Sequence, residues 1–224
     1  MRLAALVAVS ALAAACSQSV GGQAESPGSP TPAPTATSPA ASPQAPSTPT
    51  PAAAAPIDEV IDFIEAGTPV DPGSFHVAFR DGVTTRLGDA VAFVAPSGPP
   101  HSTTQCITTT GPLTCLLDPT APAPRPAQAE GVWKPGWTEF TGTTLSVGAL
   151  RGDPGPFAAG TGTELAAGQS LAFGDNRCRS DSSGLYCVNY AHRAAVRIAA
   201  AGVVPFGCLA ALAPPPESAA LYGC

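Results

Sequence analysis

The chain has 224 residues, of which 10 are basic and 16 acidic, so its net charge at pH 7 is −6. This acidic balance is unfavourable for contact with a nucleic-acid backbone, and we expect no nucleic-acid partner. The seven cysteines favour a disulfide-bonded protein outside the reducing cytosol.

The first segment, residues 1–15, is predicted to be a secretory signal peptide. Arg2 supplies one positive charge and is followed by an almost wholly small and apolar run. This run is shorter than the about 20 apolar residues that a membrane-spanning helix needs.

The segment is followed directly by a candidate lipid anchor. Residues 12–16 read LAAAC, a pattern similar to a bacterial lipobox, in which small residues precede a cysteine that receives a diacylglyceryl group. We therefore expect Cys16 to be a diacylglyceryl cysteine bearing palmitate, which holds the chain at the outer face of the plasma membrane, in the cell envelope. Leu12 stands one position further from the cysteine than is usual, so ordinary signal-peptide cleavage is the alternative.

Residues 16–56 are predicted to form a disordered linker behind that anchor. Ser17 to Pro56 contains ten prolines among mostly Ala, Ser and Thr, with one charged residue, Glu25. Such a segment buries too little apolar surface to offset the entropy of ordering it. In an extended polyproline conformation it spans on the order of 100 Å, and its Thr-Pro and Ser-Pro pairs suit O-glycosylation.

Residues 57–224 are predicted to form a single folded domain. The domain opens with a helix, because apolar residues recur at the spacing of one helical face, and Gly67 with Pro69 ends it. The acidic residues of this segment are expected on the solvated face. The apolar helix positions are Ile57, Val60, Ile61 and Ile64.

Short strands between turns follow the helix. Alternating apolar residues precede a strong turn signal at Asp81-Gly82, and a mostly buried strand is expected over residues 87–94. Further alternating strands are predicted around Leu145, Val147 and Ala149 and around Ala194, Val196 and Ile198; the alternation before Asp81 is at Phe75, Val77 and Phe79. The pattern predicts a β-rich α+β domain, with a short N-terminal helix packed on an antiparallel sheet or a small barrel-like domain.

Two segments with the same cysteine spacing are predicted to be hairpins stapled by disulfides. Residues 106–115 and 178–187 each place a Gly-containing turn between two cysteines, and an apolar approach precedes each segment, which predicts a duplicated unit. Sequence alone does not fix how six cysteines pair. Because local pairs suit hairpin arms, we expect the disulfides Cys106–Cys115, Cys178–Cys187 and Cys208–Cys224. No Cys-x-x-Cys is present, so we expect no metal site and no cofactor.

The sequence carries no strong catalytic signature. A Gly-x-Ser-x-Gly elbow, a His-Glu-x-x-His helix and a phosphate-binding loop are all missing, and no catalytic residue is assigned. The best single candidate is His192. As an alternative function we consider a hydrolase or transferase acting on cell-wall material, with His192 as base, Asp175 or Asp181 orienting it, and Ser102 or Ser182 as nucleophile.

A candidate binding patch is expected beside the second hairpin. Arg177 and Arg179 alternate along a strand and share a face, and a second group of polar and basic residues follows. Such a patch suits an anionic lipid head, a carboxylated glycan or a protein partner; pairing of the arginines with surface acids is the alternative. Trp133 and Trp137 are considered either as a sugar-stacking groove or as packing. The remaining members of the patch are Tyr190, His192 and Arg193.

Several segments together resemble the LppI family of mycobacterial envelope lipoproteins. They are IDFIEAG, TRLGDAVAF, GVWKPGW, DPGPF, FGDNRCRSDSSGLYCVNYAHR and PFGCL, behind a small-residue lipobox and a Pro/Ala/Ser/Thr stalk. The hairpin around Cys178 is also similar to a wider group of small secreted actinobacterial proteins, in which a Gly-His-Gly follows; here Ala191-His192-Arg193 stands at a different spacing. The resemblance implies a lipid-anchored envelope protein and brings no activity with it.

These observations favour a non-enzymatic, membrane-tethered module that binds an envelope lipid, a glycan or a partner protein. The long linker, the stapled domain and the missing catalytic signatures all point to this class.

Overall fold

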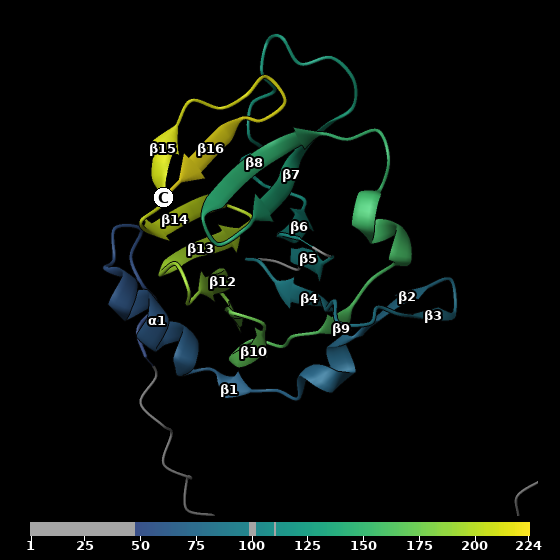
Figure 1. Cartoon of the computed structure of the whole chain (residues 1–224), viewed down its shortest axis with the longest axis vertical. Helices are drawn as coiled ribbons and strands as arrows, with labels where there is room; N and C mark the ends of the chain where they lie inside the picture. The colour runs from purple at the N-terminus through teal and green to yellow at the C-terminus, as the bar shows by residue number, and fades with distance from the viewer. Residues whose placement is uncertain (1–47, 99–101, 110) are drawn as a thin grey trace, which may run out of the picture. The chain divides into compact units, whose positions relative to one another are not determined.

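The computed structural model describes residues 48–98, 102–109 and 111–224. The predicted signal peptide, Cys16, most of the predicted linker and His101 lie outside the described residues. The described chain begins with a single α-helix and continues through strands that form two large sheets and one separate hairpin (Figure 1). In this part of the chain no helix is long and apolar enough to cross a bilayer.

The first sheet has six strands in the order β1-β10-β11-β12-β13-β14. Neighbouring strands are antiparallel except for β1, which pairs in parallel with β10. The strands are β1 (Thr68–Pro69), β10 (Gln169–Phe173), β11 (Asn176–Asp181), β12 (Gly184–Asn189), β13 (Ala194–Ala199) and β14 (Gly202–Gly207).

The second sheet has eight strands in the order β15-β16-β8-β7-β6-β5-β4-β9. It is antiparallel except for β9, which pairs in parallel with β4. The strands are β4 (Ala92–Pro96), β5 (Thr103–Thr108), β6 (Leu113–Leu117), β7 (Trp133–Phe140), β8 (Thr144–Leu150), β9 (Thr163–Glu164), β15 (Ala210–Leu212) and β16 (Ala220–Gly223). Two short 3-10 helices, η1 (Pro72–Phe75) and η2 (Gly155–Ala159), lie in the connections.

Six strands of the second sheet repeat the topology of the first. Each set has a short parallel edge strand followed by an antiparallel run of five strands, β9 then β4 to β8 and β1 then β10 to β14; the second sheet continues beyond β8 with β16 and β15. The two halves exchange their edge strands. β1 precedes the β4–β8 run in the chain but pairs with the β10–β14 run, and β9 precedes the β10–β14 run but pairs with the β4–β8 run. The backbone bonds match as well: Val70 N donates to Ser170 O, and Leu165 N donates to Val94 O.

The two cysteine hairpins occupy equivalent places in this repeat, β5–β6 and β11–β12. In each, the cysteines are directly opposed on neighbouring strands, with Cα atoms 4.1 Å apart for Cys106–Cys115 and 4.0 Å for Cys178–Cys187. The third bond joins Cys208 to Cys224. All three predicted disulfides are therefore confirmed.

The main core lies between the two sheets, where apolar side chains from both meet. Both hairpin disulfides are buried within it. Other fully buried members include Phe93, Phe140 and Leu145 from the second sheet and Leu171, Leu185 and Ile198 from the first. Alternation along each strand places these residues inward and their neighbours outward.

The helix α1 (Ile57–Glu65) covers the outer face of the first sheet, as predicted for a helix packed on an antiparallel sheet (Figure 1). Val60, Phe63 and Ile64 are buried against Tyr186 and Val188 of β12. This packing buries the apolar stripe expected of an amphipathic helix. The acidic residues of α1 are exposed, as expected; they are Asp58, Glu59, Asp62 and Glu65. The predicted β-rich α+β fold with two stapled hairpins is confirmed.

Ordered packing begins a few residues before the predicted domain start at Ile57. Pro51 is buried, and Ala55 packs against the apolar cluster beneath α1. A backbone bond from Ala55 N to Ala52 O closes a turn there. The last residues assigned to the linker therefore belong to the folded body.

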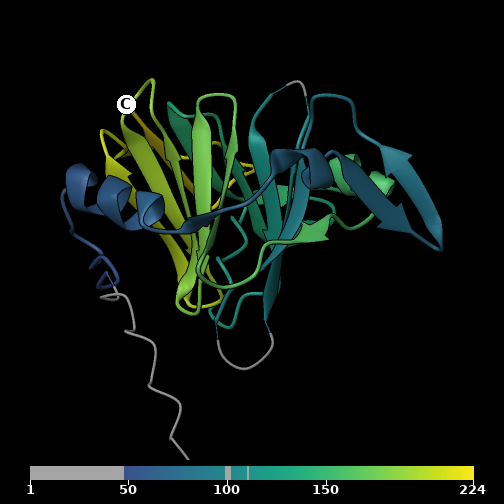
Figure 2. The same cartoon turned by 90° about the horizontal axis from the view of Figure 1, so that it is seen from below.

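The strands β2 (Val77–Arg80) and β3 (Val83–Arg86) form a hairpin that projects from the two-sheet body (Figure 2). The predicted Asp81-Gly82 turn is confirmed, with φ of 50° and 79° as a type I′ turn requires. The apolar residues that alternate before this turn do not form the buried face of the hairpin, however. Ala78 is buried instead, and Phe79, one of the alternating residues, is 47% exposed. The reason is that the hairpin packs through Ala78 against a small cluster containing Ala92.

Two further expectations about strands are corrected by turns and bulges. The strand expected over residues 87–94 begins only at Ala92, because Leu87 to Ala90 forms a turn closed by Ala90 N to Leu87 O. In β7 the pairing with β8 is interrupted between Lys134 and Thr138. The interruption contains Pro135-Gly136, residue types that mark bulges within strands.

Candidate functional site

Arg179, a predicted member of the binding patch, lies beneath the C-terminal end of α1. Its guanidinium carbon is 4.0 Å from the centroid of the Phe63 ring, and its Nη1 donates to the Phe63 carbonyl oxygen. The last carbonyls of a helix have no partner within the helix, and a basic side chain often satisfies them. Arg179 is therefore a structural contact between sheet and helix, which corrects its assignment to an open patch.

Replacing Arg179 tests this structural role. In Arg179→Met the apolar stem still covers Phe63, but the charged donor is lost, and we expect the free energy of unfolding to fall by about 1–3 kcal/mol. Arg177→Met is the matched control, because Arg177 lies on the same face of β11 and its guanidinium makes no hydrogen bond within the described chain. Chemical denaturation followed by circular dichroism measures both. Equal losses for the two variants would contradict the assignment.

Three further members of the predicted patch lie where α1 meets the turn between β12 and β13: Tyr190, His192 and Arg193. The Tyr190 hydroxyl donates to Glu65 Oε1 at 3.0 Å, and Arg193 forms an ion pair with Asp58. The pKa of Tyr190 is raised above its ordinary value by partial burial and by the hydrogen bond to Glu65, and the charge of Arg177 opposes this rise. Arg193 is thus paired with an acid of α1, which for this arginine agrees with the alternative stated from the sequence.

His192 lies exposed on this turn, where its backbone N–H donates to Asn189 Oδ1 at 3.1 Å. Among the described residues no carboxylate oxygen comes within 4.0 Å of its ring. Asp181 instead accepts bonds from Ser183 N and Ser183 Oγ and closes the hairpin turn. A base needs an orienting group and a nucleophile within hydrogen-bond reach. Within the described residues the ring of His192 makes no hydrogen bond to either kind of group.

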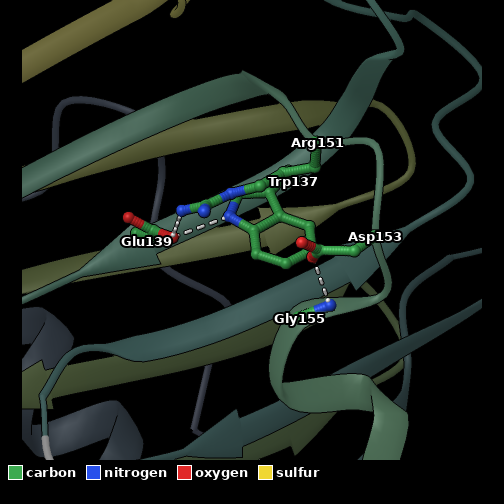
Figure 3. Close-up of polar contacts among 5 residues, drawn as sticks. All are labelled: Trp137, Glu139, Arg151, Asp153 and Gly155. Carbon is green, nitrogen blue, oxygen red and sulfur yellow. Dashed lines mark hydrogen bonds and ion pairs between the residues drawn. The ribbon is translucent and has the colours of Figure 1, made fainter.

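Trp137 is buried and does not line an open groove. Its side chain is 1% exposed, and Phe157 of η2 packs edge-on against the ring at 5.4 Å between centroids. The indole Nε1 donates to Glu139 Oε1 at 2.9 Å; the same oxygen pairs with Arg151, whose guanidinium lies over the ring (Figure 3). Because the ring is covered, Trp137 provides packing rather than a stacking surface for a sugar.

Trp133 is half-buried on the other side of the bulge in β7. Its Nε1 donates to the Ala123 carbonyl oxygen at 3.2 Å. Its ring lies close over Gly148, where an added Cβ would be 2.4 Å from the ring. The two tryptophans therefore pack against different partners and do not form the common groove considered from the sequence.

The bulge in β7 opens a cavity between the two sheets, which we call the intersheet cavity. It has a volume of about 120 Å³ and lies between β6, β7, β8 and β16 of one sheet and the β13–β14 turn of the other. Its inner wall is buried at Leu117 and Thr138, and its outer wall is partly exposed at Ala220 and Tyr222, so it opens to solvent. No charged side chain is among its described lining residues.

Sequence reasoning missed the intersheet cavity. The available signal was Pro135-Gly136 within an otherwise strand-like segment, because these residues disfavour regular pairing and favour a bulge. What the sequence does not reveal is that the other sheet meets the bulge. Within the described residues, no group of His, Cys, Asp or Glu side chains is arranged to hold a metal ion.

The comparisons with known proteins give no match: no family model, no curated protein and no solved structure is similar to this chain.

Proposed function

We propose that the chain is a lipid-anchored protein of the outer face of the plasma membrane, whose folded body is a non-enzymatic module that binds a component of the cell envelope. The proposal joins the apolar leader and lipobox-like residues before Cys16 to the properties of the folded body.

The observation that carries the anchor is the pairing of the cysteines. The chain has seven cysteines, and the six in the folded body pair with one another in three disulfides. Cys16 is the remaining one, and it directly follows the small apolar run expected to precede a lipidated cysteine. Three disulfides also suit an oxidising compartment outside the cytosol.

The binding role, rather than a catalytic one, is supported by the surroundings of His192 and by the lining of the intersheet cavity. Within the described chain the ring of His192 makes no hydrogen bond or ion pair with a carboxylate or a hydroxyl, and the intersheet cavity is lined without charged side chains. General acid–base chemistry needs titratable groups in a shared site. A stapled, rigid body on a long linker is suited to contacting another envelope component.

The Cys16→Ser variant of the full chain tests the anchor. Two acyl chains on one cysteine give stable membrane attachment, so we expect the wild-type chain in the membrane fraction and most of the variant in the soluble fraction. The intact mass of the wild type is expected to exceed that of the processed peptide by a diacylglyceryl group. Ser17→Ala is the matched control and should behave as wild type. An unmodified wild-type mass, or membrane retention of Cys16→Ser, would refute the anchor.

A further inference from the structure

The inner wall of the intersheet cavity differs from the equivalent place in the other half of the structural repeat. Thr138 lies opposite Cys115 on β7, and Val196 lies opposite Cys187 at the equivalent place on β13. Threonine and valine have the same shape and differ by a hydroxyl in place of a methyl. The half of the fold with the bulge therefore carries a polar atom where the other half carries an apolar one.

The Thr138 hydroxyl has no partner in the described chain. The residue is 0% exposed, and its Oγ1 makes no hydrogen bond there. A buried hydroxyl without a partner is unfavourable, and native proteins usually satisfy such groups with a protein atom, water or a ligand. Because Thr138 lines the intersheet cavity, an occupant of the cavity is placed to supply the missing acceptor.

The size and lining of the intersheet cavity limit the occupant. Its volume of about 120 Å³ is close to the roughly 150 Å³ of an apolar cavity that holds benzene. Among the described lining side chains, polar atoms are found on Thr138 and Tyr222, and the rest are apolar. A charged group would be buried without a counter-charge, which is strongly unfavourable. A water molecule usually makes two to four hydrogen bonds, and among the described lining side chains Thr138 and Tyr222 are the two that can make one.

We propose that the intersheet cavity binds the short apolar end of an uncharged molecule that presents one hydrogen-bond acceptor, such as an ester carbonyl, to the Thr138 hydroxyl. This inference rests on the proposed function in treating the folded body as a binding module, and it names the chemistry of the ligand.

Photolabelling of the full chain tests this proposal. The probe is a short methyl ester that carries a diazirine; the matching diazirine alkane and carboxylate serve as comparisons. We expect the ester to label cavity residues such as Val203 or Tyr222, as mapped by mass spectrometry of peptides. In Ala220→Phe the added ring fills the cavity, and labelling there should fall to background. Ala172→Phe, at an exposed position of β10, is the matched control and should keep the label.

Thr138→Val tests the hydrogen bond separately and preserves the shape of the site. We expect the ratio of ester to alkane labelling to fall by about twofold to tenfold, the range of one net hydrogen bond, while the melting temperature does not fall. The proposal is overturned if the carboxylate probe labels the cavity as well as the ester does, or if the ratio of ester to alkane labelling is unchanged in Thr138→Val. It is also overturned if labelling of the cavity does not exceed the Ala220→Phe background, a result that would indicate a cavity occupied by water. Cys16→Ser separates the two proposals, because it should alter membrane attachment and leave the label in place.

Discussion

Trp137→Ala is expected to lower the free energy of unfolding by about 3–5 kcal/mol, the usual cost of removing a large buried aromatic side chain. The ring is 1% exposed and packs against Phe157. Removal also takes away the indole N–H that donates to Glu139 and the surface on which Arg151 rests (Figure 3). Closing the space would require η2 to move toward β7 and to reshape the turn that leads into it, which is closed by the bond from Gly155 N to Asp153 Oδ1 at 2.8 Å.

Chemical denaturation of the full chain, followed by circular dichroism, measures this loss. Trp133→Ala is the matched control, because it removes the same side chain from a half-buried position of the same strand and should cost clearly less. Trp137→Phe keeps part of the packing and leaves Glu139 paired with Arg151, so it should fall between wild type and Trp137→Ala. A sugar-stacking role would give the opposite result: stability close to wild type with loss of glycan binding.

Local patterns in the sequence predicted much of the fold. The helix over α1 was predicted from its apolar spacing, and the Asp81-Gly82 turn from the backbone preferences of those residues. The cysteine pairs were predicted because each bond is local in the chain. The equivalence of the two cysteine segments also has a structural counterpart, since β5–β6 and β11–β12 occupy the same place in the repeated topology.

The features that sequence reasoning missed depend on contacts between distant segments. The exchange of edge strands joins β1 to β10 and β9 to β4. Strands of two residues are too short to carry a sequence pattern from which their pairing partner could be predicted. The sequence indicated that Arg179 lies on one face of a strand and could bind a ligand there. Its actual contacts are set by the helix that packs on that face. The hydroxyl of Thr138 became a candidate only when its place opposite Cys115 and next to a bulge was known.

Removing the Cys178–Cys187 disulfide by the double change Cys178→Ala, Cys187→Ala is expected to lower the free energy of unfolding by about 3–5 kcal/mol. The chain-entropy contribution for a loop of this length is about 2.7 kcal/mol. The rest comes from packing, because both cysteines are 0% exposed in the core between the sheets. The equivalent pair Cys106→Ala, Cys115→Ala should give a similar loss, since it occupies the matching place in the repeat.

The double change Cys208→Ser, Cys224→Ser is the control that separates the two contributions. That bond closes a longer loop, with a sequence separation of 16 against 9, so chain entropy alone predicts a slightly greater loss, about 3.1 kcal/mol. Both of its cysteines are exposed, however, and little packing is lost with them. Denaturation curves in which the Cys208–Cys224 variant is destabilised as much as the Cys178–Cys187 variant would show that the hairpin bonds act through the unfolded chain alone. A larger loss for the two core disulfides would show that they are part of the packing that holds the sheets together.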